Sequence, residues 1–192
     1  MTRSEKCEES AFARLLRAAY FAALKHRSQR RKGSEADPYI NHPLHVASLL
    51  AGAGKTSDVN VLIAALLHDA VEDTDATLDD IREQFGEEVA DLVAEVSDDK
   101  SLPKHERKAL QVEHAAAISR EAQCIKLADK ISNVRDMYAN PPVWSAERKQ
   151  EYMDWSQRVV DGMRGANTPL EKLFEQTMVR ARQAVDNPGH DG

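Results

Sequence analysis

The stretch from Val59 to Asp73, VNVLIAALLHDAVED, decides the fold class of this chain. Its large apolar residues recur at helical spacing and form one broad stripe, made of Val59, Leu62, Ile63, Leu66 and Leu67. A stripe of this width is typical of a helix that is buried over most of its girth. We therefore predict one central helix over residues 59–73. Its apolar run, residues 61–67, is far too short to cross a bilayer.

Segments on the N-terminal side of this stretch carry the same helical signature. A first amphipathic helix is predicted over about residues 9–27, with an apolar face made of Phe12, Leu15, Leu16, Ala19, Ala22 and Ala23. Pro43 suits the first position of a second helix, because a proline there loses no hydrogen bond. That helix is expected to end at Gly52 to Gly54 and to carry His42 at its entrance.

Helical patterns also continue toward the C-terminus. We predict helices over 77–85 with Gly86 as a stop, over 87–96, over about 104–120 and over 123–137. A capping signature made of Thr168, Pro169 and Glu171 predicts that the last helix begins at Thr168. The chain is thus predicted to be one all-α domain of about eight to ten helices over residues 1–192, with a core at about 9–185 and a disordered tail at 186–192.

The composition restricts the function classes. A net charge of -6 argues against a general nucleic-acid binder, because affinity for phosphate backbones needs a basic surface. The two cysteines, Cys7 and Cys124, lie far apart and match no metal or redox spacing, which is expected of a protein in the reducing cytoplasm. The N-terminal residues have no apolar signal segment, so neither export nor membrane insertion is expected.

Four polar residues at the end of the central helix are the first candidates for chemistry. His68, Asp69, Glu72 and Asp73 are spaced so that they share one patch, one turn apart. Three acids crowded on a buried helix repel one another unless a cation compensates them, which indicates a divalent metal. The alternative is a helix end with solvated charges. A His-Asp pair alone is weak, since His190-Asp191 in the tail is another such pair that we interpret as chance.

Two distant segments add further metal-ligand candidates. PYINHP at 38–43 contains His42, and IKLADKISNVRD at 125–136 places Asp129 and Asn133 on one helix face. Each has a plain alternative: a packed histidine in the first segment, and a surface ladder of ion pairs in the second. Taken together, His42, His68, Asp69 and Asp129 form a mixed nitrogen and oxygen set that suits Mn²⁺, Fe²⁺, Mg²⁺ or Zn²⁺.

The strings PYINHP, LLHDAVEDT and IKLADKISNVRD resemble the hydrolase domain of the RelA/SpoT family, specifically its small stand-alone alarmone hydrolases. The resemblance covers about residues 10–180 and implies the helical HD-domain fold. It implies metal ligands at His42, His68, Asp69 and Asp129, with Mn²⁺ as the usual metal. It also implies a catalytic acid pair at Glu72 and Asp73, which would orient and deprotonate the attacking water.

The resemblance further implies contacts with the substrate. Arg31 and Lys32 are the best matches to a phosphate-contacting segment within a basic loop, whose five cations are Lys25, Arg27, Arg30, Arg31 and Lys32. The alternative for this loop is a solvated basic turn. Asn133 matches a position near the substrate, while Lys104, Arg148 and Tyr152 are weaker matches, because MYANPPVW at 137–144 leaves the register of the following helix open. Lys130 stands where long family members often have arginine, with little change expected.

The expected reaction is removal of the 3′-pyrophosphate from guanosine alarmones, releasing pyrophosphate and GDP or GTP. A chain of this length has no room for the synthetase and regulatory domains of large family members, so we expect hydrolysis without synthesis. The alternatives are a phosphohydrolase that acts on another nucleotide, such as the 2′- or 3′-phosphate of a dinucleotide cofactor, and a catalytically silent nucleotide sensor. The sequence does not indicate the oligomeric state.

Overall fold

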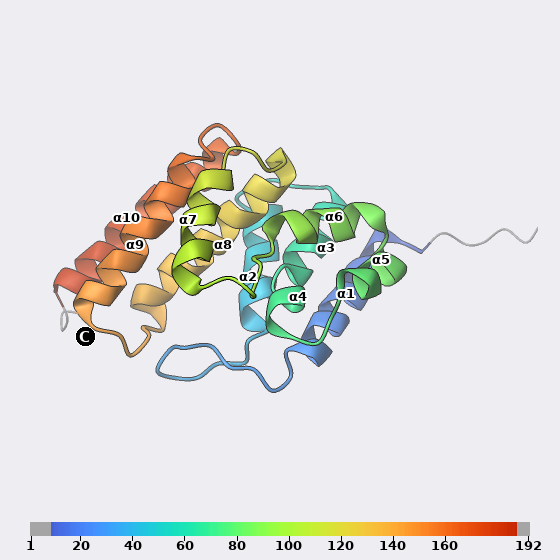
Figure 1. The fold of residues 1–192 in the computed structure, drawn as a ribbon, viewed down its shortest axis with the longest axis horizontal. Coiled ribbons are helices and arrows are strands. Elements are labelled where there is room, and N and C mark those ends of the chain that lie inside the picture. Colours follow the sequence, from blue (N-terminus) through green and yellow to red (C-terminus); the bar gives the residue numbers. More distant parts are fainter. Residues whose placement is uncertain (1–8, 188–192) are drawn as a thin grey trace, which may run out of the picture.

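The computed structural model describes residues 9–187, and within this range the chain forms helices and no strand (Figure 1). The expected all-α fold is confirmed. The helices are α1 (Ala11–Lys25), α2 (Asn41–Ala51), α3 (Val59–Leu67), α4 (Ala70–Asp73), α5 (Leu78–Phe85), α6 (Glu87–Val96), α7 (Lys104–His114), α8 (Arg120–Ala139), α9 (Ala146–Asp161) and α10 (Thr168–Asp186).

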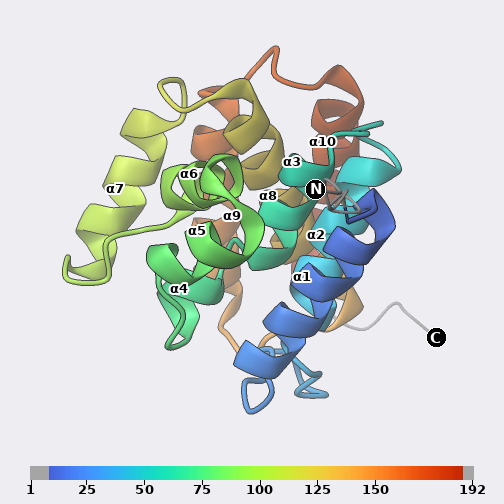
Figure 2. The same cartoon turned by 90° about the vertical axis from the view of Figure 1, so that its right-hand side faces the viewer.

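Helix α3 lies at the centre, as its sequence predicts. Every residue from Val61 to Leu67 is buried, and the helix packs against α1, α2, α6 and α8 (Figures 1 and 2). Burial of a large aliphatic side chain stabilises the fold by roughly 1.5–3 kcal/mol relative to leaving it in water. The segment is therefore a rigid platform for whatever follows it in the chain.

The central helix ends earlier than predicted. Instead of one helix over 59–73, α3 ends at Leu67, a turn contains His68 and Asp69, and the short α4 begins at Ala70. The physical reason lies in His68, whose Nδ1 donates to the Ala65 carbonyl oxygen at 2.7 Å. The side chain thus satisfies a backbone acceptor near the helix end, and the break turns both His68 and Asp69 toward the interior.

Helix α2 carries its proline at the third position rather than at the first. It begins at Asn41, so Pro43 is the third residue, where a missing N–H is still tolerated because first-turn amides have no partner within the helix. His42 therefore lies in the first turn and is buried. The expected stop is confirmed, since Gly52 is the C-cap.

Elsewhere, the observed helix ends agree with the predicted ones where a glycine ends the helix. They differ where a polar side chain caps it. The helices over 77–85 and 87–96 are found within one residue, and Gly86 between them has a φ of +97°. Helix α7 ends at His114 rather than near Arg120, and a turn and a bend follow over residues 115–118. Helix α8 begins at Arg120, three residues earlier than expected, because the Ser119 hydroxyl caps it there by accepting from the Ala122 amide.

The last helix has a different cap from the one predicted. The Asn167 side chain, and not the Thr168 hydroxyl, caps α10 by accepting from the Leu170 amide at 3.1 Å. Glu171 still returns to the cap, since it accepts from the Asn167 amide. The helix extends through Asp186, within the expected tail, and residues 188–192 lie outside the described part.

The apolar face predicted for α1 is only partly correct. Ala18 and Ala22 are fully buried, whereas Phe12 is 81% and Leu16 is 69% exposed. Helix α1 approaches α3 through its small residues. Spacing alone cannot tell these two apolar faces apart, because both repeat every turn. None of the helices within residues 9–187 combines the length and the apolar character that crossing a membrane requires.

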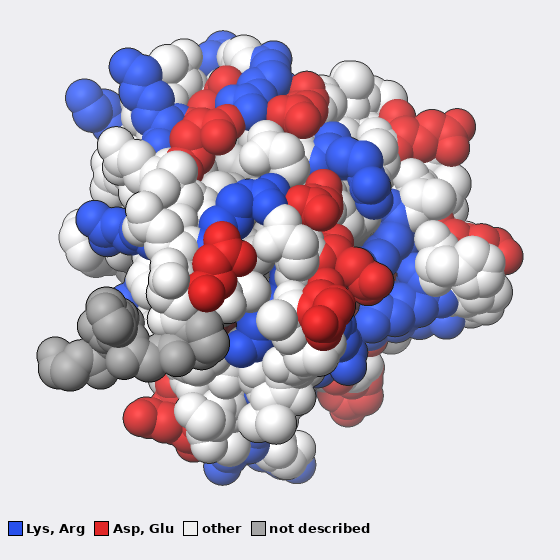
Figure 3. Space-filling view, turned by 90° about the vertical axis from the view of Figure 1, so that its left-hand side faces the viewer, with Lys and Arg blue, Asp and Glu red and all other residues white. Residues whose placement is uncertain are grey.

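The surface mixes charges of both signs. On the face seen from the side of α9 and α10, Lys and Arg side chains alternate with Asp and Glu side chains (Figure 3). This face thus differs from the uniformly basic surface that attracts nucleic-acid backbones. Five of the cations that the sequence singles out, Arg30, Arg31, Lys32, Lys104 and Arg148, line the cavities described next.

Candidate active site

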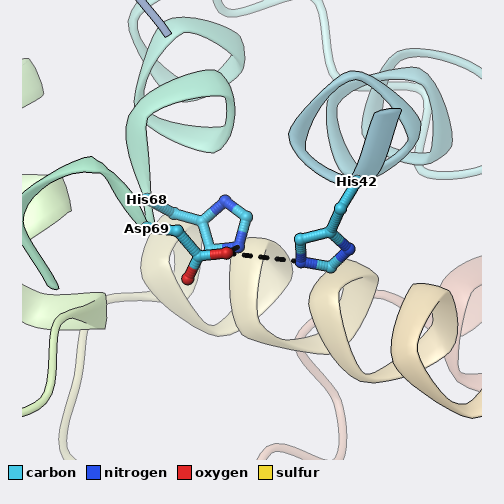
Figure 4. Close-up of side chains that lie close together, drawn as sticks. All are labelled: His42, His68 and Asp69. Atoms are coloured by element: carbon cyan, nitrogen blue, oxygen red, sulfur yellow. Dashed lines mark ion pairs between the residues drawn. The ribbon is translucent and has the colours of Figure 1, made fainter. Parts of the chain in front are cut away.

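Three segments bring the four expected metal ligands together. His42 comes from the first turn of α2, His68 and Asp69 from the break between α3 and α4, and Asp129 from the middle of α8. The Nε2 atom of His42 lies 3.1 Å from Asp129 Oδ1 and 3.5 Å from Asp69 Oδ2. The Nε2 atom of His68 lies 3.2 Å from Asp69 Oδ2 and 3.8 Å from Asp129 Oδ1. The three side chains drawn in Figure 4 turn toward one another.

The donor atoms fit a divalent cation. Because the His68 Nδ1 donates to a carbonyl, its Nε2 keeps a free lone pair, and this buried atom has no hydrogen-bond partner. The ligand atoms of His42, His68 and Asp69 lie within 4.8 Å of one another. Two imidazole nitrogens with carboxylate oxygens form the mixed set that Mn²⁺, Fe²⁺ or Zn²⁺ accepts. The unpartnered Nε2 of His68, which lies near the carboxylates of Asp69 and Asp129, is therefore available as a metal ligand.

The electrostatics of the cluster agree with this fit. Burial works against the charged forms, yet the neighbouring histidines hold the pKa of Asp69 below its usual value, and Lys130 with both histidines holds that of Asp129 well below it. Burial alone would lower the pKa of His68, but Asp69 and Asp129 raise it well above its ordinary value. The two carboxylates thus attract a positive charge, which a metal ion would supply in place of a proton.

Helix α8 carries buried cations rather than a surface ladder of ion pairs. Lys130 is 4% exposed, donates to Asp129 Oδ2 at 2.9 Å and lies 4.5 Å from the centre of the Trp155 ring. Lys126 is also buried and donates to the Val96 carbonyl oxygen at 3.0 Å. The ladder alternative is therefore wrong, because a buried lysine at position 130 orients one carboxylate oxygen of Asp129 and leaves the other to the cluster.

Tyr39 is a site residue that the sequence argument missed. Its hydroxyl donates to Asp69 Oδ2 at 2.6 Å, and its ring stacks on His26 at 4.8 Å. Burial and the nearby Asp69 raise the pKa of this phenol, so it stays a donor. The signal was present in the string PYINHP, where Tyr39 precedes His42 by three residues. A hydroxyl in that place fixes the direction of the Asp69 carboxylate.

The two acids of the expected catalytic pair face different spaces. Glu72 lines a cavity of about 120 Å³ together with the cluster, and its Oε1 accepts from the Asp98 amide at 2.6 Å. Burial raises the pKa of Glu72 to about 7, with Asp98 and Asp69 adding to the shift. A carboxyl that exchanges its proton near neutral pH, beside a metal site, is suited to general acid–base work.

Asp73 instead lines a larger cavity of about 400 Å³. Its Oδ1 accepts from Lys100 at 2.7 Å and its Oδ2 from Gln29 at 3.0 Å. Glu72 and Asp73 diverge because they are adjacent in α4, and neighbouring residues of a helix point about 100° apart. Tyr39 and Asn133 line both cavities and form their common border.

Arg31 is the best-anchored cation of the basic loop. Its guanidinium donates to Asp136 Oδ2 at 2.6 and 3.2 Å and to Asn133 Oδ1 at 2.8 Å. Arg30, Arg31 and Lys32 line the larger cavity. Lys25 and Arg27 are not among its lining residues, and Lys25 pairs with Asp75 at 2.9 Å. The solvated-turn alternative thus applies to only part of the loop.

The structure also gives the register of the segment after α8. A side chain at Gly33 would lie within 2.5 Å of the Asn140 amide group, so the basic loop and this segment pack directly against each other. Trp144 and Tyr152 consequently line the larger cavity as well. The Arg148 guanidinium lies 4.4 Å from the centre of the Trp144 ring.

A third cavity, of about 410 Å³, adjoins the second. The two share Lys32, Trp144 and Tyr152. The further cations around it are Lys100, Lys104, Arg107, Lys108 and Arg148. Burial and the neighbouring cations lower the pKa of Lys104. All six expected substrate contacts therefore lie at the two larger cavities, which together form a cationic region beside the metal cluster.

Residues 18–156 match the family model of the HD domain. The chain belongs to the HD-domain family. This family implies a divalent metal, and the cluster described above is the place where the chain offers one. The expected HD-domain fold is thereby confirmed.

Named relatives agree with the predicted resemblance. The HD-domain chain is 54% identical over 174 residues to the guanosine-3′,5′-bis(diphosphate) 3′-pyrophosphohydrolase MESH1 of Xenopus tropicalis. The aligned region covers 90% of this chain and 97% of the relative. Its identity to the human protein of the same name is 54% over 172 residues, with 87% and 96% covered. An enzyme with the corresponding name from Aquifex aeolicus is 43% identical over 128 residues, 64% of this chain and 17% of that longer protein.

Solved structures show the same relation. A structure described as a metazoan orthologue of SpoT that hydrolyses ppGpp superimposes on the HD-domain chain with a TM-score of 0.85 at 47% identity, covering 88% of this chain and 95% of that one. The structure of lmo0812 from Listeria monocytogenes gives a TM-score of 0.59 at 31% identity, with 74% and 99% covered. The predicted membership of the RelA/SpoT-related group is confirmed.

Proposed function

We propose that this chain hydrolyses the 3′-pyrophosphate of guanosine 3′-diphosphate 5′-di- or triphosphate, yielding GDP or GTP and pyrophosphate. One observation carries the proposal: the cavity of the two histidines and two aspartates adjoins, at Tyr39 and Asn133, a cation-lined cavity of about 400 Å³. A cavity of that size accommodates a nucleotide. The relatives named for this activity support the choice of substrate.

His42, His68, Asp69 and Asp129 would hold the metal, which we propose to be Mn²⁺, one ion per site. When bound, a divalent metal supplies Lewis acidity and lowers the pKa of water. The chain's own part is to aim the ligands. The Ala65 carbonyl orients His68, Tyr39 orients Asp69, and Lys130 orients Asp129.

Glu72 is the proposed general base. It lines the same cavity as the cluster, and its raised pKa lets it take the proton of the attacking water and return it to the leaving oxygen. Asp73 has a different proposed role. Bonded to Lys100 and Gln29, it would hold the wall of the nucleotide cavity, which it lines.

The remaining proposed contacts bind the substrate. Arg31, Lys32 and Asn133 would hold phosphate oxygens in the cavity of about 400 Å³, which all three line, with Arg31 kept in place by Asp136. Lys104 and Arg148 would contact the 5′-phosphates, while the Tyr152 ring supports the nucleoside. These cations are local, and we expect no binding to nucleic acid or membrane. We place the enzyme in the cytoplasm, where the buried thiol of Cys124 stays reduced.

Two alternative functions make different demands on the same residues. A phosphohydrolase acting on a dinucleotide phosphate would use the same cluster with a different occupant of the two larger cavities. A silent sensor would need no acid in the metal cavity besides the two ligand aspartates, yet Glu72 lies there. The site therefore favours an enzyme, and the substrate is the quantity to test.

The test is product analysis by anion-exchange chromatography. Chelator-treated protein is mixed with ppGpp, pppGpp or a dinucleotide 2′-phosphate, each with and without Mn²⁺. We expect metal-dependent release of pyrophosphate with GDP or GTP, and no turnover by a Glu72→Gln control. Release of phosphate from the dinucleotide alone would keep the metal site and overturn the substrate. Binding of ppGpp without turnover would indicate a sensor.

A further inference from the structure

A buried serine lies between two histidines on the far side of the metal cluster. The Ser132 hydroxyl on α8 is 3.0 Å from His42 Nδ1 and 2.9 Å from His45 Nδ1, both histidines being on α2. Ser132 is only 2% exposed and His42 is 4% exposed. His45 is half-buried and contributes no atom to the cluster of expected ligands. Nothing in the proposed reaction uses Ser132 or His45, so their arrangement needs its own explanation.

With a metal bound, the three side chains can donate their hydrogen bonds in only one direction, from His42 to Ser132 and from Ser132 to His45. A metal at the cluster takes the lone pair of His42 Nε2, which faces Asp69 and Asp129, so the ring proton must be on Nδ1. That N–H donates to the Ser132 oxygen. The serine then has one O–H left, which donates to His45 Nδ1, and His45 carries its own proton on Nε2.

Removal of Ser132 or His45 interrupts this series of hydrogen bonds. Without the serine oxygen, the buried Nδ1–H of His42 loses its acceptor. A buried donor without a partner is unfavourable, because it has given up its hydrogen bond to water and gained none in return. The ring would recover that loss by rotating or by moving its proton to Nε2, and either change removes the lone pair from the cluster. Groups that bond to a metal-ligating histidine in this way fix its tautomer and raise its affinity for metal.

We propose that Ser132 and His45 are positioning residues that hold His42 in the tautomer and orientation required for metal binding. The inference rests on the proposed metal site and extends it by two residues that touch neither metal nor substrate. Ser132 acts directly on His42. His45 acts through the serine, by taking its hydroxyl proton and leaving the oxygen free to accept.

Metal affinity, measured apart from activity, is the readout. Chelator-treated wild type and variants are titrated with Mn²⁺ by isothermal titration calorimetry, and the melting temperature of each metal-free protein is recorded. Ser132→Ala should raise the Kd for Mn²⁺ by roughly 10- to 100-fold, the usual effect of losing such a partner. The matched control is Ser156→Ala, another fully buried serine, whose hydroxyl donates only to its own helix at Tyr152. Its Kd should stay at the wild-type value.

Variants of His45 distinguish the proposed relay, the two hydrogen bonds from His42 to Ser132 and from Ser132 to His45, from an effect of simple packing. His45→Ala should weaken Mn²⁺ binding, whereas His45→Asn should restore most of it, because the amide oxygen can take the place of Nδ1 as an acceptor. In the Ser132→Ala background, His45→Ala should have no further effect, since the two residues act in series. The tautomer itself is visible in long-range ¹H–¹⁵N spectra of the Zn²⁺-loaded protein, where His45 should carry its proton on Nε2.

The outcomes distinguish this inference from the proposed function. If wild type binds no Mn²⁺, the proposed metal site fails and the relay fails with it. If wild type binds Mn²⁺ and a folded Ser132→Ala variant binds it equally well, only the relay is overturned. Should Ser132→Ala not fold, equal Kd values for His45→Ala, His45→Asn and wild type would overturn it instead.

Discussion

Replacement of Glu72 by glutamine should make the metal-free protein more stable while it removes turnover. The side chain is only 15% exposed and lies near Asp98 and Asp69, and the pKa of its carboxyl rises from the 4.5 of an ordinary glutamate to about 7. At 1.36 kcal/mol for each pKa unit, the charged carboxylate lowers the free energy of unfolding by about 3 kcal/mol near pH 8. Glutamine has nearly the same shape, can still accept from the Asp98 amide and carries no charge.

The pH dependence follows from the direction of this pKa change. Well below pH 4.5 the carboxyl is protonated in both folded and unfolded chains, so wild type and Glu72→Gln should be equally stable. Between pH 4.5 and 7 the unfolded wild type releases its proton first, and the folded state loses stability as the pH rises. The variant does not take part in this loss. Its advantage should therefore grow with pH and level off above about pH 7.

The assay is chemical denaturation of both chelator-treated proteins at pH 4, 6 and 8. We expect a gain of about 3 kcal/mol for the variant at pH 8, the amount that the raised pKa of Glu72 implies with the attraction of the nearby Lys100 already included. The control is Glu113→Gln, an exposed glutamate on α7, which should leave stability unchanged. Equal or lower stability of Glu72→Gln at pH 8 would refute the reasoning. With Mn²⁺ restored, its kcat should fall by roughly 10²- to 10⁴-fold, while its metal content stays that of wild type.

Three further substitutions test separate parts of the molecule. Asp69→Ala should abolish metal binding and turnover together, as measured by metal content after dialysis and by product release, whereas the exposed Asp91→Ala should affect neither; retained metal would disprove the ligand role. Tyr39→Phe removes the donor to Asp69 and should weaken Mn²⁺ binding roughly 10-fold by calorimetry, an effect that Tyr20→Phe on the surface should lack. Ile63→Ala should lower the free energy of unfolding by about 2–5 kcal/mol without changing the Kd of the folded protein for Mn²⁺, and a change below 1 kcal/mol would contradict the central place of α3.

Short sequence patterns indicate the metal-ligand candidates but not the residues that orient them. The expected ligands do converge, because each belongs to a short string whose residue types already match metal chemistry. Tyr39, Ser132 and Lys130 were not assigned their roles, since tyrosine, serine and lysine have many uses and their spacing reveals none. Only their distances to Asp69, His42 and Asp129 give them one.

Helix boundaries illustrate the same limit. Gly52 and Gly86 end helices where the sequence predicts, because a glycine acts through its own backbone. The break after Leu67 depends on a side chain that bonds to the Ala65 carbonyl, and the caps at Ser119 and Asn167 depend on local hydrogen bonds that compete with alternatives one residue away.

The sequence by itself determined the all-α class, the buried central helix and the types of the metal-ligand candidates, because hydrophobic periodicity and side-chain chemistry are properties of neighbouring residues. The tertiary structure decided which apolar face of α1 is buried, that Glu72 and Asp73 face different cavities, and that Lys126 and Lys130 are buried rather than solvated. These outcomes depend on contacts between segments far apart in the chain, where the free energy of packing is shared among many residues and no local pattern records it.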